Sequence, residues 1–138
     1  ISPQLLKAYR ETDYIIRQGE HDITLKIEQE LPVALSALLE QEGEQSWSII
    51  SAYNPFSEPV SDEANQRKDV LLRQVLAEMG KTVYPAVGRG QSGEWEEPSH
   101  FVMGLSYEMA QALGTVFEQN AVLYGELGAS LELVFCGR

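Results

Sequence analysis

The feature that most constrains the fold is an apolar run that leads through a polar loop into a helix. Residues 47–52 (WSIISA) predict a buried strand, and the loop that follows contains Pro55 and Pro59. Ser61 then precedes a long segment whose apolar residues recur at helical spacing. Because α/β sheets place ligands where a strand ends and a helix begins, this loop predicts a binding site.

Length and composition predict one globular domain over residues 1–138. The chain is 43% hydrophobic and 22% charged, which is enough apolar material for a core. No run approaches the ~20 apolar residues of a membrane span, and no charged start followed by an apolar stretch marks a secretory signal. No membrane partner is therefore expected.

The charge balance argues against nucleic acid as a partner. The formal net charge is −11, and a strongly acidic surface repels phosphate backbones. No basic residue lies between Lys26 and Arg67, whereas many acidic residues do. We interpret this segment as a solvated surface, with a basic partner or a bound cation as the alternative.

Cysteine and histidine usage limits the compartment and the cofactors. Cys136 is the only cysteine, so no intrachain disulfide can form, which favours the cytoplasm. One cysteine with His21 and His100 supplies too few ligands for a structural zinc site. No cofactor is predicted.

Periodicity and capping signals predict the order of elements α-β-β-α-β-α-β-β-α-β-β. Serine or proline marks the start of four helices near residues 3, 32, 62 and 107, and Met109, Leu113 and Phe117 are expected to point inward in the last one. Strands are predicted at residues 12–17, 23–27, 47–53, 81–87, 99–105, 121–124 and 131–136. Hairpins mixed with helical crossovers predict an α/β (α+β) domain. Its sheet would be mixed, with about six to seven strands flanked by about four helices.

Residues 88–93 spell the G-x-G-x-x-G pattern of dinucleotide-binding loops. That pattern needs a helix after the third glycine to receive the pyrophosphate. Here Glu94, Glu96 and Glu97 follow, and Pro98 ends any helix. We therefore interpret these residues as a hairpin loop and expect no nucleotide.

Ser99 and His100 are neighbours on a predicted strand. Adjacent strand residues point to opposite faces, so the two side chains cannot form a catalytic dyad, and we expect each to be satisfied locally. Glu97 and Ser99, two residues apart, share a face.

The polar residues of the turns admit two interpretations. Asparagine and serine often bind nearby backbone in turns, so these side chains could hold only their own loops together. In the other interpretation, the turns meet at one rim of the sheet and face a ligand. Convergence of Glu126, Glu97 and Asp62 would further offer a Mg²⁺ site or an acid–base pair.

Four blocks of residues carry a resemblance to a known family. They are Thr12-x-Tyr14; Ala52-x-Asn54-Pro55-x-Ser57 with Ser61 and Asn65; Gly93-x-Trp95-x-Glu97-Pro98-Ser99; and Gln119-Asn120-Ala121 with Gly125. On these blocks the chain resembles bacterial domain-of-unknown-function family 3293. The resemblance implies a small single-domain bacterial protein, without an assigned reaction, cofactor or partner. It adds weight to the polar turns, because its blocks fall there.

Our leading hypothesis is that a polar pocket at the strand ends binds a small polar ligand or a peptide end. Whether the domain also catalyses a reaction is left open, with Glu97 or Glu126 as the acid or base. The candidate ligand-binding residues are Asn54, Ser57, Asn65, Glu97, Ser99, Gln119, Asn120 and Glu126. The alternative is a protein-interaction module or homo-oligomer without chemistry, which uses the acidic surface or an edge strand.

Overall fold

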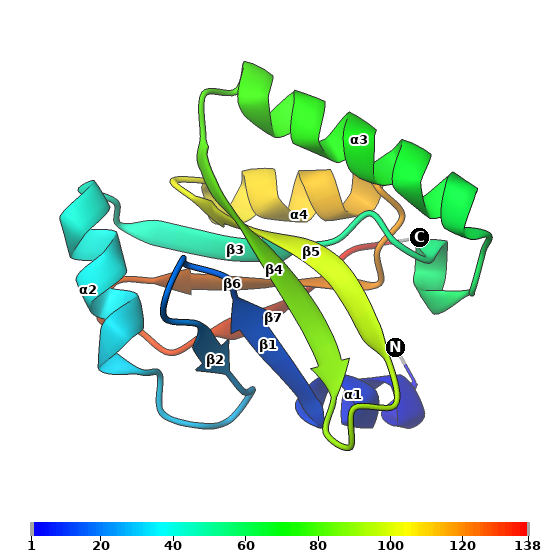
Figure 1. The fold of residues 1–138 in the computed structure, drawn as a ribbon, viewed down its shortest axis with the longest axis horizontal. Helices are drawn as coiled ribbons and strands as arrows, with labels where there is room; N and C mark the ends of the chain where they lie inside the picture. Colours follow the sequence, from blue (N-terminus) through cyan, green and yellow to red (C-terminus); the bar gives the residue numbers. More distant parts are fainter. Residues whose placement is uncertain (1, 138) are drawn as a thin grey trace.

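Seven strands form one antiparallel sheet in the computed structural model, which describes residues 2–137 (Figure 1). The strands are β1 Thr12–Ile16, β2 Ile23–Leu25, β3 Ser46–Ile50, β4 Thr82–Gly90, β5 Glu96–Met103, β6 Ala121–Glu126 and β7 Glu132–Phe135. The helices are α1 Pro3–Arg10, α2 Val33–Glu42, α3 Asp62–Glu78 and α4 Tyr107–Val116, with a short 3-10 turn, η1, at Pro55–Ser57. The predicted α+β class and the order of elements are confirmed.

The sheet differs from the prediction in having no parallel pair among the described strands. Its order is β2-β1-β4-β5-β3-β6-β7, and each neighbouring pair is antiparallel. The helical crossovers do join strands that run the same way, since β3 and β4 are each antiparallel to β5. One strand lies between the pair joined through α3 and between the pair joined through α4, and three lie between β2 and β3. A crossover alone therefore does not predict a parallel pair.

Helix ends follow the local signals in the sequence. Ser2, Ser61 and Ser106 cap α1, α3 and α4, because each hydroxyl accepts a hydrogen bond from a backbone N–H three residues on, at 3.1–3.2 Å. Gly43 and Gly80 follow α2 and α3 with left-handed φ angles of 69° and 70°. These caps explain why the helix positions could be read from sequence.

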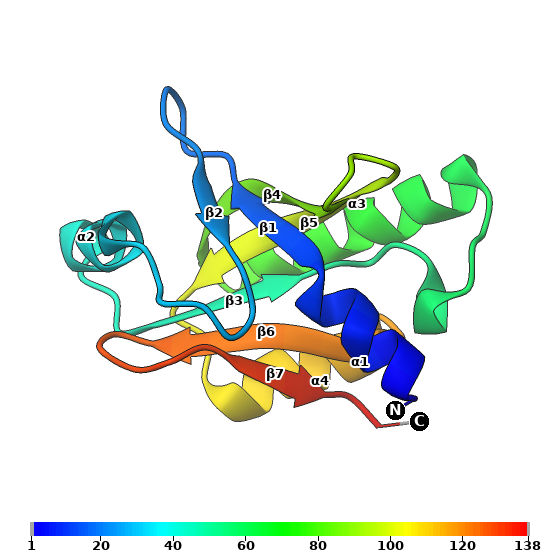
Figure 2. The same cartoon turned by 90° about the horizontal axis from the view of Figure 1, so that it is seen from below.

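The sheet packs a separate apolar cluster on each of its two faces. Figure 2 shows α2 at one end of the sheet and α1 at the other. On the first face, which we call the closed face, α3 and α4 lie on the strands through Leu72, Leu76, Ala110 and Leu113. On the second face, which we call the open face, α2 packs against Trp47 and Phe101. The open face is covered by α2 at one end, and α1 lies at the other.

One helix is rotated relative to the prediction. Met109 was expected to point inward, but it is 43% exposed, and Ala110 is fully buried in its place. The reason is that small residues of α4 face the sheet and allow the helix to approach it closely. A Cβ atom on Gly114 would collide with Cys136 Sγ and would stand 2.8 Å from Val122 Cγ1. A long methionine side chain cannot enter so narrow a space, whereas alanine and glycine can.

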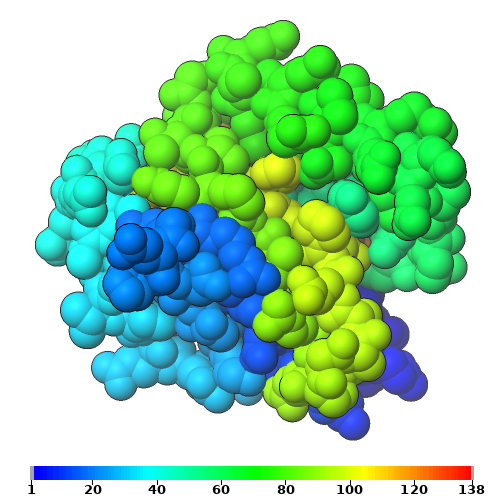
Figure 3. Space-filling model, viewed as in Figure 1, coloured from blue at the N-terminus to red at the C-terminus, as the bar shows by residue number. Residues whose placement is uncertain are grey.

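The β4–β5 hairpin is longer than predicted. Gly88 and Gly90 are part of β4, and the loop shrinks to residues 91–95. A strand follows the third glycine, so no helix N-terminus stands behind the G-x-G-x-x-G pattern. In Figure 3 this hairpin and the β1–β2 hairpin cover the face of the molecule nearest the viewer.

Within residues 2–137, no helix combines the length and the apolar character needed to cross a bilayer.

Candidate functional site

A cavity of about 320 Å³ lies on the open face, at the end of the sheet next to α1. All strands except β2 contribute to its wall, together with α1 and the loop that follows β3. Its apolar lining includes Leu5, Ala8, Ile49, Leu123 and Leu133. A cavity of this size is within the range of small-molecule sites.

The polar side of the cavity is built from segments that are far apart in the sequence. It consists of Tyr9, Ser51, Tyr53, Asn54, Ser57, Glu97, Ser99 and Gln119. The tyrosine at position 9 comes from α1, the residues from 51 to 57 from the loop after β3, and Glu97 and Ser99 from β5. The polar turns therefore meet at one rim of the sheet.

Glu97 is the central charged group of this site. Its carboxylate accepts a hydrogen bond from Asn54 Nδ2 at 3.2 Å. Burial raises the pKa of Glu97, and hydrogen bonds from Asn54 and Ser51 act in the opposite direction. Among the described residues, no lysine, arginine or histidine forms an ion pair with this carboxylate. Glu97 therefore carries an uncompensated charge in a partly desolvated place.

Ser99 lies next to Glu97 on the same face of β5, as the period of two predicted. It is only 7% exposed, and its hydroxyl has no hydrogen-bond partner among residues 2–137. The expectation that this side chain is satisfied locally is wrong. Since buried hydroxyls are normally hydrogen-bonded, an unsatisfied one beside a cavity is a candidate contact for a bound molecule.

The loop after β3 has an unusual backbone. Asn54, Phe56 and Ser57 have φ angles of 47°, 53° and 64°, in the left-handed region that few side chains other than asparagine favour. Paired asparagines hold this conformation. Asn65 Oδ1 accepts from the Asn54 backbone N–H at 2.8 Å, and Asn65 Nδ2 donates to Asn54 Oδ1 at 2.9 Å. Such strain persists only where the surroundings impose it, and it is common at binding sites.

The link between α4 and β6 supports the same loop. Asn120 Nδ2 donates to Ser57 Oγ at 2.9 Å, and Gln119 Nε2 donates to the Tyr53 carbonyl at 3.1 Å. The Phe56 N–H donates to the Glu118 carbonyl at 2.6 Å. These bonds fix the rim of the cavity from a second side.

The structure places the predicted site residues in three groups. Asn54, Ser57, Glu97, Ser99 and Gln119 line the cavity. Asn65 and Asn120 stand behind this lining and hold the loop through the bonds described above. Glu126 lies elsewhere: it is exposed at the far end of β6 and accepts a hydrogen bond from the Tyr124 hydroxyl at 3.2 Å. That these residues bind a ligand stays a prediction.

Sequence reasoning missed the aromatic part of the site. Tyr9, Tyr14, Tyr53 and Trp95 all line the cavity, and none of them is among the predicted site residues. A signal was available, since Tyr14 and Trp95 fall within the blocks that carry the family resemblance. Burial raises the pKa of Tyr9 to about 12, with a smaller contribution from the Glu97 charge.

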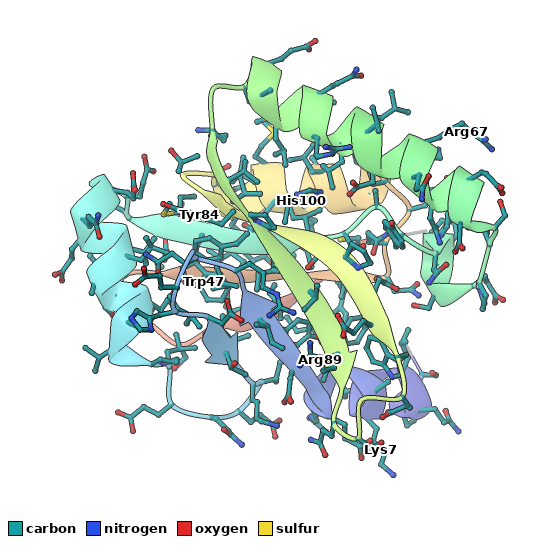
Figure 4. The ribbon with its side chains drawn as sticks, viewed as in Figure 1. Lys7, Trp47, Arg67, Tyr84, Arg89 and His100 are labelled. Atoms are coloured by element: carbon teal, nitrogen blue, oxygen red, sulfur yellow. The ribbon has the colours of Figure 1, made fainter. Side chains whose placement is uncertain are left out.

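The residue that follows Ser99 points to the closed face, as predicted. His100 Nε2 lies 2.7 Å from Asp69 Oδ1 on α3, and Asp69 Oδ2 lies 3.3 Å from Arg73 Nε. Figure 4 shows His100 beneath α3, while Trp47 lies toward α2. His100 is thus satisfied by a distant residue and takes no part in the cavity.

The proposed convergence of three carboxylates is not found. Within residues 2–137, no three histidine, cysteine, aspartate or glutamate side chains are grouped so that they could hold a metal ion. The site described here is therefore one of hydrogen bonds, aromatic rings and a single unpaired carboxylate.

Comparison with known proteins gives one match. A family model described as "Protein of unknown function (DUF3293)" matches residues 50–122, more than half of the chain. The matched segment contains the loop after β3, Glu97, Ser99 and Gln119, and it leaves α1 and β1 outside. Comparison with curated proteins and with solved structures finds no match.

Proposed function

The chain belongs to the DUF3293 family, and we propose that it binds a small amphipathic molecule in the cavity beside α1. The observation that carries this proposal is the mixed character of the cavity wall. Apolar side chains such as Ile49 and Leu123 line the cavity together with Glu97 and the unpartnered Ser99 hydroxyl. A few polar groups within an apolar wall are typical of small-molecule sites.

Because the lining contains both apolar and polar side chains, the ligand is expected to have an apolar part and a polar part. Its apolar part would bury surface against Ile49, Leu123 and Leu133, which favours binding by about 25 cal/mol for each Å² removed from water. Its polar part would lie near Glu97 and Ser99. A hydrogen-bond donor suits Glu97, because an ionised carboxylate only accepts.

The alternative of an interaction module without a ligand finds less support. Its surface would be an apolar patch combined with a flat polar region in place of the pocket. Several large apolar side chains are exposed on α4 and β7, including Met109, Val116 and Phe135. However, the rim residues are held around a hollow by bonds between distant segments, which a flat surface would not require.

Filling the cavity tests the proposal. Gly88 lines it, and a Cβ atom there would meet Thr12, Trp95 and Tyr14 at 3.5–3.9 Å, which are ordinary contacts. Gly88→Ala should therefore leave the cavity usable, whereas Gly88→Leu should occupy it. The experiment is an NMR screen of amphipathic fragments against both variants and the unchanged protein.

We expect fragments that shift the amide signals of Glu97 and Ser99 in the unchanged protein and in Gly88→Ala, with the shifts lost in Gly88→Leu. A second filling variant, Ala8→Trp on the exposed side of α1, guards against a local folding defect at position 88. Fragments that bind all four proteins equally, or that bind only away from the cavity, would contradict the proposal.

A further inference from the structure

The charge of the cavity restricts its ligand more than its size does. Its lining contains Glu96 and Glu97 and no lysine, arginine or histidine. Arg89 Nη2 lies 3.1 Å from Glu96 Oε2 and compensates that carboxylate, but Glu97 has no such partner among the described residues. An anionic ligand would be repelled here, and a cationic one attracted.

Aromatic side chains surround the same carboxylate. Tyr9, Tyr14, Tyr53 and Trp95 line the cavity together with Glu97. A Cβ atom on Gly88 would meet Trp95 Cζ3 at 3.8 Å and Tyr14 Cε1 at 3.9 Å, so both rings lie beside position 88 of the lining. The faces of aromatic rings attract cations, and rings grouped around a pocket are the usual receptor for alkylated ammonium ions.

The rings and the carboxylate line one cavity, so a bound molecule would meet both. Burial is the largest cause of the raised pKa of Tyr9, Tyr14 and Tyr53. The Glu97 charge adds to it at each of them, after the charges of Asp69 and Asp62 at Tyr53.

We infer that the ligand of this cavity is a small alkylated ammonium ion, held by Tyr9, Tyr14, Tyr53 and Trp95 around the charge of Glu97. This inference rests on the function proposed above and names the chemical class of its ligand. An alkylated ammonium suits the site, because the lining supplies four aromatic side chains beside the uncompensated charge of Glu97. Charge and ring faces are what an alkylated ammonium requires, and it needs no hydrogen bond.

A pair of probes of nearly equal shape tests the inference. Choline carries a quaternary ammonium, and 3,3-dimethylbutan-1-ol carries an uncharged tert-butyl group in the same place. Titration calorimetry should show choline binding about tenfold or more tightly than the alcohol, the ratio expected for a cation against aromatic faces and a charge. The anion 3,3-dimethylbutanoate should not bind.

Two variants with matched controls locate the effect. Glu97→Gln keeps an acceptor for Asn54 and removes the charge, so it should weaken choline about tenfold and leave the alcohol unchanged. Trp95 is 42% exposed, so its replacement carries little risk for folding. Trp95→Ala should weaken choline several-fold, and Trp95→Phe should restore most of the affinity.

Three results would overturn the inference. If the alcohol binds as tightly as choline, the cavity binds by apolar contact alone, and the proposed function stands without the ammonium. If choline binds but Glu97→Gln and Trp95→Ala leave its affinity unchanged, or if choline does not bind, the ammonium ligand is rejected. In that case the fragment screen with the Gly88 variants still decides separately whether the cavity binds small molecules.

Discussion

Two neighbouring residues of β5 show how differently the two faces of the sheet are built. On the closed face, His100 is bonded to Asp69 at 2.7 Å, and a third residue, Arg73, completes the group. On the open face, the hydroxyl of Ser99 is equally buried and has no partner among residues 2–137. The same strand thus carries a completed polar network on one side and an incomplete one on the other.

The comparison separates two uses of buried polar groups. On the closed face, the bond between His100 and Asp69 joins α3 to the sheet. A missing partner does not by itself mark a binding group, because the Ser48 hydroxyl on the closed face is also buried and unpartnered. Ser99 differs in that it borders a cavity together with Glu97, where a bound molecule can complete its interactions.

The largest effect is expected from a truncation in the closed face. Leu72 of α3 is fully buried against the sheet. Leu72→Ala should therefore lower the free energy of unfolding by about 3 kcal/mol, because burial is lost and a void is left. Leu133 lines the existing cavity and is only half-buried, so Leu133→Ala should cost about 1 kcal/mol. Urea denaturation measures both, and equal losses would mean that the open face is packed as tightly as the closed one.

A smaller loss is expected from the polar network. Asp69→Ala leaves His100 buried without its partner and should destabilise the fold by about 2 kcal/mol. Arg73→Ala should cost at most about 0.5 kcal/mol, because the Arg73 side chain is 58% exposed. Thermal unfolding distinguishes the two. Similar small losses for both would show that the His100–Asp69 bond is not a main support of the closed face.

Two glycines offer a matched test of space on the two faces. Gly114→Ala on α4 would bring a Cβ atom within 2.8 Å of Val122 Cγ1, and we expect a net loss of about 1 kcal/mol after the gain in helix propensity. Gly88→Ala should be close to neutral, because its contacts are 3.5 Å or longer. If Gly114→Ala were the better tolerated of the two, the closed face would be looser than its packing indicates.

The smallest effect concerns pH. Because burial raises the folded-state pKa of Glu97 above its ordinary value of 4.5, this group supports folding at low pH, and that support is lost as pH rises through the folded pKa. Glu97→Gln removes the dependence. The variant should gain stability relative to the unchanged protein as pH increases above 4.5, and the difference should be absent at lower pH. Chemical denaturation of both proteins at several pH values measures this difference. A variant that loses stability relative to the unchanged protein as pH increases would contradict the prediction.

Local signals predicted most of the fold. Serine caps and apolar spacing located the helices, and alternation located the strands, because these patterns depend on residues a few positions apart. The same signals could not predict that every neighbouring pair of strands is antiparallel. That outcome depends on β5 lying between β3 and β4, a pairing of residues far apart in the sequence. The predicted inward direction of Met109 was wrong for a related reason. How closely α4 approaches the sheet depends on the packing of Gly114 against Val122, a contact between separate elements.

The candidate site divides in the same way. Alternation along one strand predicted that Glu97 and Ser99 share a face, and their position in the cavity agrees with it. Tyr9 and Tyr14 come from elements whose position relative to β5 no local pattern reveals, so their place in the lining was missed. Glu126 lies between the predicted strands at 121–124 and 131–136 and was grouped with the site as a turn carboxylate, yet it stands at the end of β6 opposite Gln119.

Local sequence patterns were enough for the kinds and order of the secondary structure elements, for the charge of the protein, and for which side chains of β5 share a face of the sheet. Each of these depends on composition or on neighbours within about one helical turn. Only the tertiary structure decided that α1, the loop after β3 and the β5 carboxylate enclose one cavity. Contacts between such distant segments follow from how whole elements pack, and a single chain carries no periodic signal for them.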